Sequence, residues 1–144
     1  MNAPMMFGAK AYAQVGLESG VNSASPHKLI VMLYDGAIES IRKAKMYTEA
    51  EDTVEKVKAI DKAMRIISDG LIVSLDVKSG GQLAEQLLSL YQFVIRELVL
   101  ANAKNDPAKM DDCIRLLADL RSAWNDIGSQ PPSSGGSNSV KGSL

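Results

Sequence analysis

The sequence predicts an all-α protein: an antiparallel four-helix bundle with a short N-terminal arm and a disordered C-terminal tail. Apolar residues recur at helical spacing over four long segments, and capping or turn signals separate these segments. No segment shows the apolar–polar alternation of a strand. We therefore expect an arm over 1–24, the bundle over 25–128 and the tail over 129–144, where Ser, Gly and Pro dominate.

The first helix is expected to begin at Ser25 and Pro26, because serine is a good N-cap and proline is tolerated at the first helical position. The residues from Leu29 to Leu33 are apolar nearly all round, which is wider than one core-facing stripe requires. The apolar residues beyond continue at helical spacing at Ala37, Ile38, Ile41 and Ala44.

The second helix is expected to open at Asp52 with a capping-box-like pattern that ends at Glu55. Its core seam is predicted at Val57, Ile60, Met64, Ile67, Leu71 and Leu75. A second row contains small residues and should leave a shallow groove; it comprises Ala59, Ala63, Ile66, Gly70 and Val73. Two i,i+4 pairs, Asp52–Lys56 and Asp61–Arg65, are assigned to the outer face.

The third helix is predicted to run from about Gln82 to Asn102, after a turn over 76–81 that ends with two glycines. One apolar seam follows Leu83, Leu87, Leu90, Val94, Leu98 and Ala101, and a neighbouring row follows Ala84, Leu88, Tyr91, Ile95 and Val99. The fourth helix should start with Asp106 as N-cap and Pro107 at the first helical position. Its core residues are predicted at Met110, Cys113, Leu117, Leu120, Trp124 and Ile127, with Gly128 as its stop.

The residues offer no catalytic, cofactor-binding or metal-binding constellation, so we expect a protein that is not an enzyme and needs no cofactor. His27 is the single histidine and is expected to be a solvated first-turn residue; Cys113 is the single cysteine and is expected in the core. The net charge is −1 and no basic stripe is present, which argues against nucleic acid. Without a signal-peptide pattern or a long apolar run, no membrane span is expected, and the cytosol is the expected compartment.

The remaining signal is surplus apolar surface on the first three predicted helices. It has two readings that can both hold: a broad core covered by the N-terminal arm, or a groove for an amphipathic or extended peptide. The candidate partner-binding residues are Tyr12, Val15, Leu33, Tyr34, Ile38, Ile66, Gly70, Val73, Tyr91 and Ile95. The alternative function is a structural four-helix oligomerisation or adaptor module, in which the same apolar rows form subunit interfaces.

The sequence also resembles the flagellar secretion chaperone FliS family. The resemblance spans about residues 9–127 in collinear order, with AYAQV at 11–15, ASPHKLI at 24–30, MLYDGA at 32–37, SLD at 74–76 and GGQLA at 80–84. Leu90-Tyr91, Ala101-Asn102 and Ala123-Trp124 extend it. Gln86 and Gln92-Phe93 depart from the pattern of many relatives.

This resemblance implies a cytosolic export chaperone that binds the disordered C-terminal segment of flagellin. It implies that binding prevents premature polymerisation and aids delivery to the flagellar type III export gate, with a gate component and other flagellar regulators as further partners. It also implies that the arm around Tyr12 covers apolar surface and contacts the export machinery.

Overall fold

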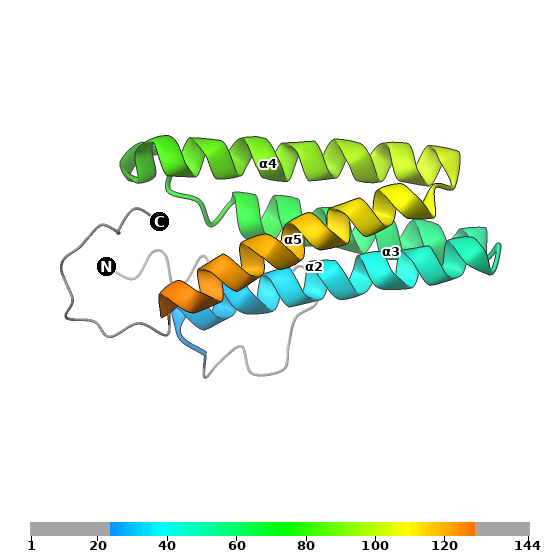
Figure 1. Ribbon diagram of the computed structural model, residues 1–144, viewed down its shortest axis with the longest axis horizontal. Helices are drawn as coiled ribbons and strands as arrows, with labels where there is room; N and C mark the ends of the chain where they lie inside the picture. Colours follow the sequence, from blue (N-terminus) through cyan, green and yellow to red (C-terminus); the bar gives the residue numbers. More distant parts are fainter. Residues whose placement is uncertain (1–23, 129–144) are drawn as a thin grey trace.

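The computed structural model describes residues 24–128, and these form a bundle of long antiparallel helices (Figure 1). The elements are α2 (Pro26–Glu49), α3 (Thr53–Arg65), a π-helix η2 (Ile66–Ile72), α4 (Val77–Lys104) and α5 (Pro107–Gly128). The predicted all-α class and four-helix bundle are confirmed. The predicted arm falls on residues outside this range except for Ala24, and the predicted tail lies wholly outside it.

Helix α2 packs mainly against α3 and α5, while α4 packs against α3, α5 and η2. The start of α2 and the end of α5 lie at one end of the bundle, and the connections α2–α3 and α4–α5 lie at the other (Figure 1). We call the latter the distal end. Helices α2 and α4 therefore face each other across the bundle rather than as neighbours.

Side-chain caps begin the helices where the sequence predicts them, because each cap supplies an acceptor for a backbone N–H that the helix itself leaves unpaired. The Ser25 hydroxyl accepts from the Lys28 N–H at 3.1 Å. The Asp52 carboxylate accepts from the Glu55 N–H at 3.2 Å, and the Asp106 carboxylate accepts from the Lys109 N–H at 3.2 Å. The three predicted N-caps are confirmed.

The predicted turn over 76–81 is instead a short helical segment followed by a kink. Asp76 caps this segment by accepting from the Ser79 N–H at 3.1 Å. The helix is then interrupted at Gly81, whose φ of 60° and ψ of −139° are outside the helical region. Glycine tolerates this positive φ because it has no Cβ, so the predicted break at Gly80-Gly81 is confirmed.

The second predicted helix changes geometry part-way. It is α-helical only to Arg65, and residues 66–72 form a π-helix, whose turns are wider than those of an α-helix. Ile66 and Ile67, adjacent in sequence, are both fully buried. At Gly70 the backbone comes so close to α2 that an added Cβ would lie 2.7 Å from Leu33 Cδ2.

The core is built from aliphatic side chains of every helix, joined by Met110 and Cys113 of α5. Burying each large aliphatic side chain contributes about 1.5–3 kcal/mol, which makes this core the main source of stability. Cys113 is 2% exposed, which confirms its predicted place in the core. Burial raises the pKa of its thiol to about 12, so the side chain stays neutral and unreactive.

The position of Lys56 differs from the sequence prediction. It was assigned with Asp52 to an outer-face pair, but its side chain is buried, at 4% exposure. Its Nζ donates to the Asn102 carbonyl at 3.1 Å and to Asn105 Oδ1 at 2.7 Å. The reason is the C-terminus of α4, whose last carbonyls carry partial negative charge and attract the ammonium inward. The other predicted pair, Asp61–Arg65, is present at 4.0 Å.

Candidate functional site

Six of the candidate partner-binding residues are buried, and two of these are the tyrosines Tyr34 and Tyr91. Leu33 and Ile38 of α2 and Ile66 and Gly70 of η2 are buried, and Leu33 fills the space beside Gly70. The small-residue row is therefore filled by α2 at this level rather than open. A direct contact between these residues and a partner stays a prediction, and it would require the helices to move.

Tyr34 and Tyr91 are brought together across the bundle. Each is 2% exposed, and their hydroxyl oxygens lie 2.5 Å apart in a buried hydrogen bond between α2 and α4. The rings are tilted by 56°, with centroids 6.3 Å apart. Burial raises the pKa of both hydroxyls, so both tyrosines are neutral at physiological pH.

Two candidates offer apolar surface. Val73, directly after η2, is exposed, and Ile95 of α4 is half-buried against the core. The two candidates of the N-terminal arm, Tyr12 and Val15, lie outside the described residues. Of the candidates that are described, Val73 and Ile95 are the ones that a partner could touch without rearrangement.

Other large apolar side chains are exposed that the sequence did not single out for binding. Within the described part of the chain, these are Met46, Val54, Val57, Phe93, Val99 and Leu100. Val57 was predicted in the core seam of the second helix but is 44% exposed, because Lys56 takes the inward position beside it. Leu100 belongs to neither predicted row of the third helix, so helical spacing gave no signal for it.

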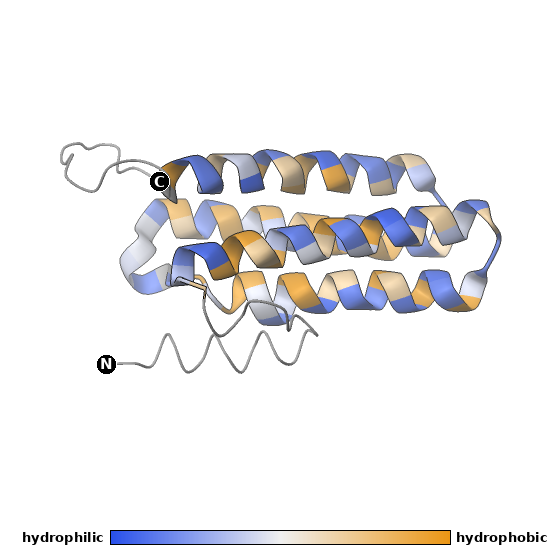
Figure 2. Cartoon of the chain, turned by 90° about the horizontal axis from the view of Figure 1, so that it is seen from below, coloured by the Kyte–Doolittle hydropathy of each residue, from blue (hydrophilic) through white to orange (hydrophobic). Residues whose placement is uncertain are grey.

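Three of these exposed side chains, together with the half-buried Ile95, are what we call the α3–α4 stripe: Val54 and Val57 on α3, Ile95 and Val99 on α4. The contact of Lys56 with Asn102 places the start of α3 beside the end of α4. Val54 and Val57 are i,i+3 neighbours, and Ile95 and Val99 are i,i+4 neighbours, so each pair shares one helix face. Apolar and polar segments alternate along the helices (Figure 2).

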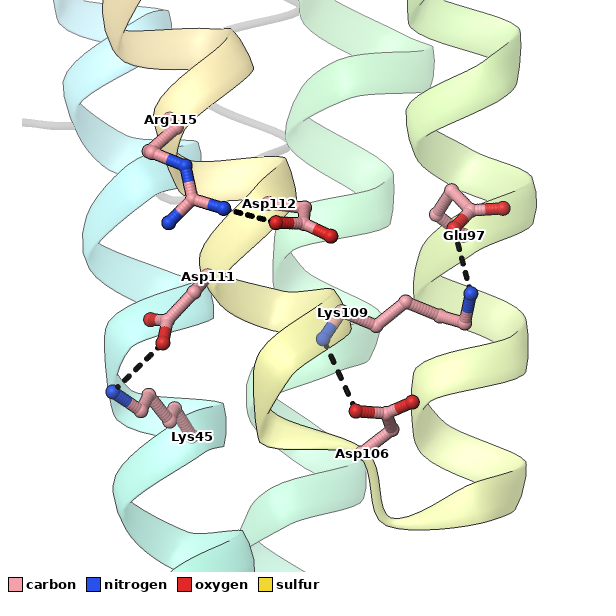
Figure 3. Close-up of polar contacts among 7 residues, drawn as sticks. All are labelled: Lys45, Glu97, Asp106, Lys109, Asp111, Asp112 and Arg115. Atoms are coloured by element: carbon pink, nitrogen blue, oxygen red, sulfur yellow. Dashed lines mark hydrogen bonds and ion pairs between the residues drawn. The ribbon is translucent and has the colours of Figure 1, made fainter.

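The sides of α5 are more polar. At the distal end, Lys45 of α2 pairs with Asp111 at 3.1 Å, and Lys109 pairs with Glu97 of α4 at 3.0 Å (Figure 3). Arg115 pairs with Asp112 within α5. Ion pairs therefore tie α5 to both of its neighbours at this end.

The opposite end of the bundle is closed by His27 and Trp124. Their rings stack at 4.8 Å with an interplanar angle of 9°, and Trp124 Nε1 donates to the His27 carbonyl at 3.1 Å. His27 was expected to be solvated, but this stacking leaves it only partly exposed, and its Nε2 is buried without a partner in residues 24–128. Trp124 is partly buried against the core, as its predicted place on the core seam requires.

The described residues do not gather the groups that metal chemistry would need. Across 24–128, no three His, Cys, Asp or Glu side chains are placed to hold a metal ion. Among the same residues, no helix is long and apolar enough to cross a membrane. What this part of the chain presents is a packed bundle with an apolar flank.

Similarity to known proteins identifies the family of this chain. The model of the family described as "Flagellar protein FliS" matches residues 8–131 of this chain. The chain belongs to the FliS family. The resemblance noted in the sequence is confirmed.

Curated members of the FliS family match this chain over most of their length. The flagellar secretion chaperone FliS of Salmonella typhimurium (strain LT2) is 45% identical over 120 residues, which cover 83% of this chain and 89% of that protein. FliS of Escherichia coli (strain K12) is 36% identical over 83% of this chain and 88% of its own length. FliS of Bacillus subtilis (strain 168) is 31% identical over 74% and 78%. Membership in a family of flagellar secretion chaperones supports an export chaperone role.

Proposed function

We propose that this FliS-family chain binds the disordered C-terminal segment of flagellin in the cytosol, prevents its premature polymerisation and aids its delivery to the flagellar export gate. The observation that carries this proposal is the α3–α4 stripe. Its three valine side chains are exposed and Ile95 is half-buried, although the same helices bury a core beside them. Apolar side chains exposed on two neighbouring helices can form part of a protein-binding site.

An amphipathic helix or an extended segment suits such a surface. Two neighbouring helices with apolar residues at i, i+3 and i, i+4 spacing can accept an apolar face laid along them. Folding of a disordered segment upon binding typically buries about 1,000–3,000 Å² and costs about 2–5 kcal/mol in ordering. The stripe alone is smaller than that, so the client would extend over further surface such as Phe93 and Leu100 of α4, which are 44% and 40% exposed.

The proposed activity requires no covalent chemistry. An apolar segment held against α3 and α4 is withheld from other flagellin molecules, and a competing interaction at the export gate suffices to release it. Family membership supports the secretion role, and the exposed side chains support the binding mode. An export-gate component and other flagellar regulators remain proposed partners on the family resemblance.

Calorimetry with the full chain and a peptide of the flagellin C-terminal segment from the same bacterium tests the proposal. We expect binding with a negative heat-capacity change, because apolar surface is buried. The double substitution Val57→Ser/Val99→Ser should weaken binding at nearly unchanged stability, since both side chains are about half exposed. Met46→Ser is the matched control, because Met46 is 53% exposed but lies on α2, outside the stripe.

Sedimentation of the same samples separates this function from the alternative oligomerisation module. The chaperone should form a complex with the peptide that is lost in the stripe variant. A homo-oligomer that takes up no peptide and dissociates when the stripe is substituted would contradict the proposal and favour the module.

A further inference from the structure

The Tyr34–Tyr91 pair joins two helices that are not close neighbours. Helix α2 packs mainly on α3 and α5, whereas α4 packs on α3, α5 and η2. Within residues 24–128, no other side-chain hydrogen bond or ion pair links α2 to α4 besides the 2.5 Å contact of the two hydroxyls. The pair is therefore a direct polar contact between two helices that do not pack side by side.

A hydrogen bond restricts geometry in a way that apolar contacts do not. Apolar burial is non-directional, so the hydrophobic effect by itself does not select one rotation of a helix. A hydroxyl–hydroxyl bond needs a short distance and a favourable angle, and in a buried place no water can replace a lost partner. Both tyrosines are 2% exposed, so a rotation of α4 that separated the two hydroxyls would leave them without a replacement partner.

That rotation matters for the α3–α4 stripe. Ile95 and Val99 follow Tyr91 by four and eight residues, so they lie about 40° and 80° around the axis of α4 from it. A rotation of α4 about its axis at Tyr91 would carry both side chains with it and change their position relative to α3. The other polar ties of α4, Lys56 to Asn102 and Lys109 to Glu97, lie farther toward the distal end.

We propose that Tyr34 and Tyr91 are positioning residues: their buried hydroxyl pair sets the rotation of α4 and thereby aligns the apolar residues of the α3–α4 stripe for the client. The pair acts through α4, because neither tyrosine is exposed enough to touch a bound peptide. The expected effect on client binding rests on the proposed function, whereas the restraint on α4 does not depend on it.

The test compares Tyr34→Phe/Tyr91→Phe with the wild type and with Tyr47→Phe, which removes a hydroxyl from α2 without touching the pair. Replacing both partners of a buried hydrogen bond by apolar groups of the same shape is nearly neutral for stability. We therefore expect an almost unchanged melting temperature for the double variant. Its affinity for the flagellin C-terminal peptide should fall by about fivefold or more, and amide hydrogen exchange should accelerate in α4. Tyr47→Phe should match the wild type in all three measurements.

Wild-type affinity and wild-type exchange in the double variant would overturn the inference. So would a loss of affinity that merely follows a loss of stability, because the pair would then be an ordinary structural contact. If the wild type fails to bind the peptide, the proposed function fails, and hydrogen exchange in α4 still decides whether the pair restrains that helix.

Discussion

Replacing Lys56 by methionine should destabilise the distal end of the bundle. The substitution keeps an unbranched apolar stem of similar length and removes the ammonium that donates to the Asn102 carbonyl and to Asn105 Oδ1. Asn105 is exposed, so water can replace its lost donor, whereas Asn102 is only partly accessible. The lost interaction with the end of the α4 dipole adds to the effect.

The magnitude follows from two opposing terms. A buried acceptor left without its donor costs about 1–3 kcal/mol, and a cation at a partly buried helix C-terminus contributes up to about 2 kcal/mol. The opposing contribution is the cost of burying the lysine charge, which methionine avoids. That cost is several kcal/mol before the hydrogen bonds of the ammonium offset it. Because Lys56 keeps two good acceptors, we expect a net loss of about 2 kcal/mol, or roughly 9 °C in melting temperature for a bundle of this size.

Thermal and urea unfolding of the Lys56→Met variant provide the measurement. Lys58→Met is the matched control, because the Lys58 side chain is 69% exposed and, among residues 24–128, bonds only Glu55 on its own helix. We expect a change within about 0.5 kcal/mol. A Lys56→Met protein as stable as the wild type, or more stable, would refute the reasoning. It would mean that the cost of burying the ammonium equals or exceeds the stabilisation from its two hydrogen bonds.

Two further predictions concern the core. Gly70→Ala should lower the free energy of unfolding by about 1–3 kcal/mol, because the added Cβ would lie 2.7 Å from Leu33 Cδ2. The additional change Leu33→Ala should relieve that clash. Additive losses in a double-mutant cycle would contradict this explanation. Cys113 should make stability fall as pH rises from its ordinary pKa of 9.0 toward about 12, since the folded state keeps a proton that the unfolded state releases. Thermal unfolding of Cys113→Ala across this range should show a shallower fall, and an identical slope would count against the assignment.

The sequence was sufficient for the fold because the deciding signals were local. Ser25, Asp52 and Asp106 cap helices through contacts three residues away, and the kink at Gly81 follows from one residue that tolerates a positive φ. Helical spacing also placed Cys113 and Leu117 in the core, since both belong to an uninterrupted apolar seam.

The errors arose where a contact distant in sequence decides the outcome. Lys56 points inward because the end of α4 lies 46 positions later in the chain and offers it a carbonyl. Because Lys56 points inward, Val57 points outward, and its predicted place in the core is wrong. The close approach of Leu33 to Gly70 likewise fills a row that seemed open from residue sizes alone. Helical periodicity identifies an apolar side chain, but the neighbouring helix decides whether it is covered.

The contact between Trp124 and His27 also gives the protein an intrinsic optical reporter. Trp124 is the single tryptophan of the chain, so the indole emission comes from the end of the bundle where α2 begins and α5 ends. Loss of the stack or of the Nε1–H bond to the His27 carbonyl would change that emission directly. A client that settles on α3 and α4 would leave the signal almost constant, whereas one that spreads onto the α2–α5 end would shift it, so a simple titration distinguishes the two footprints.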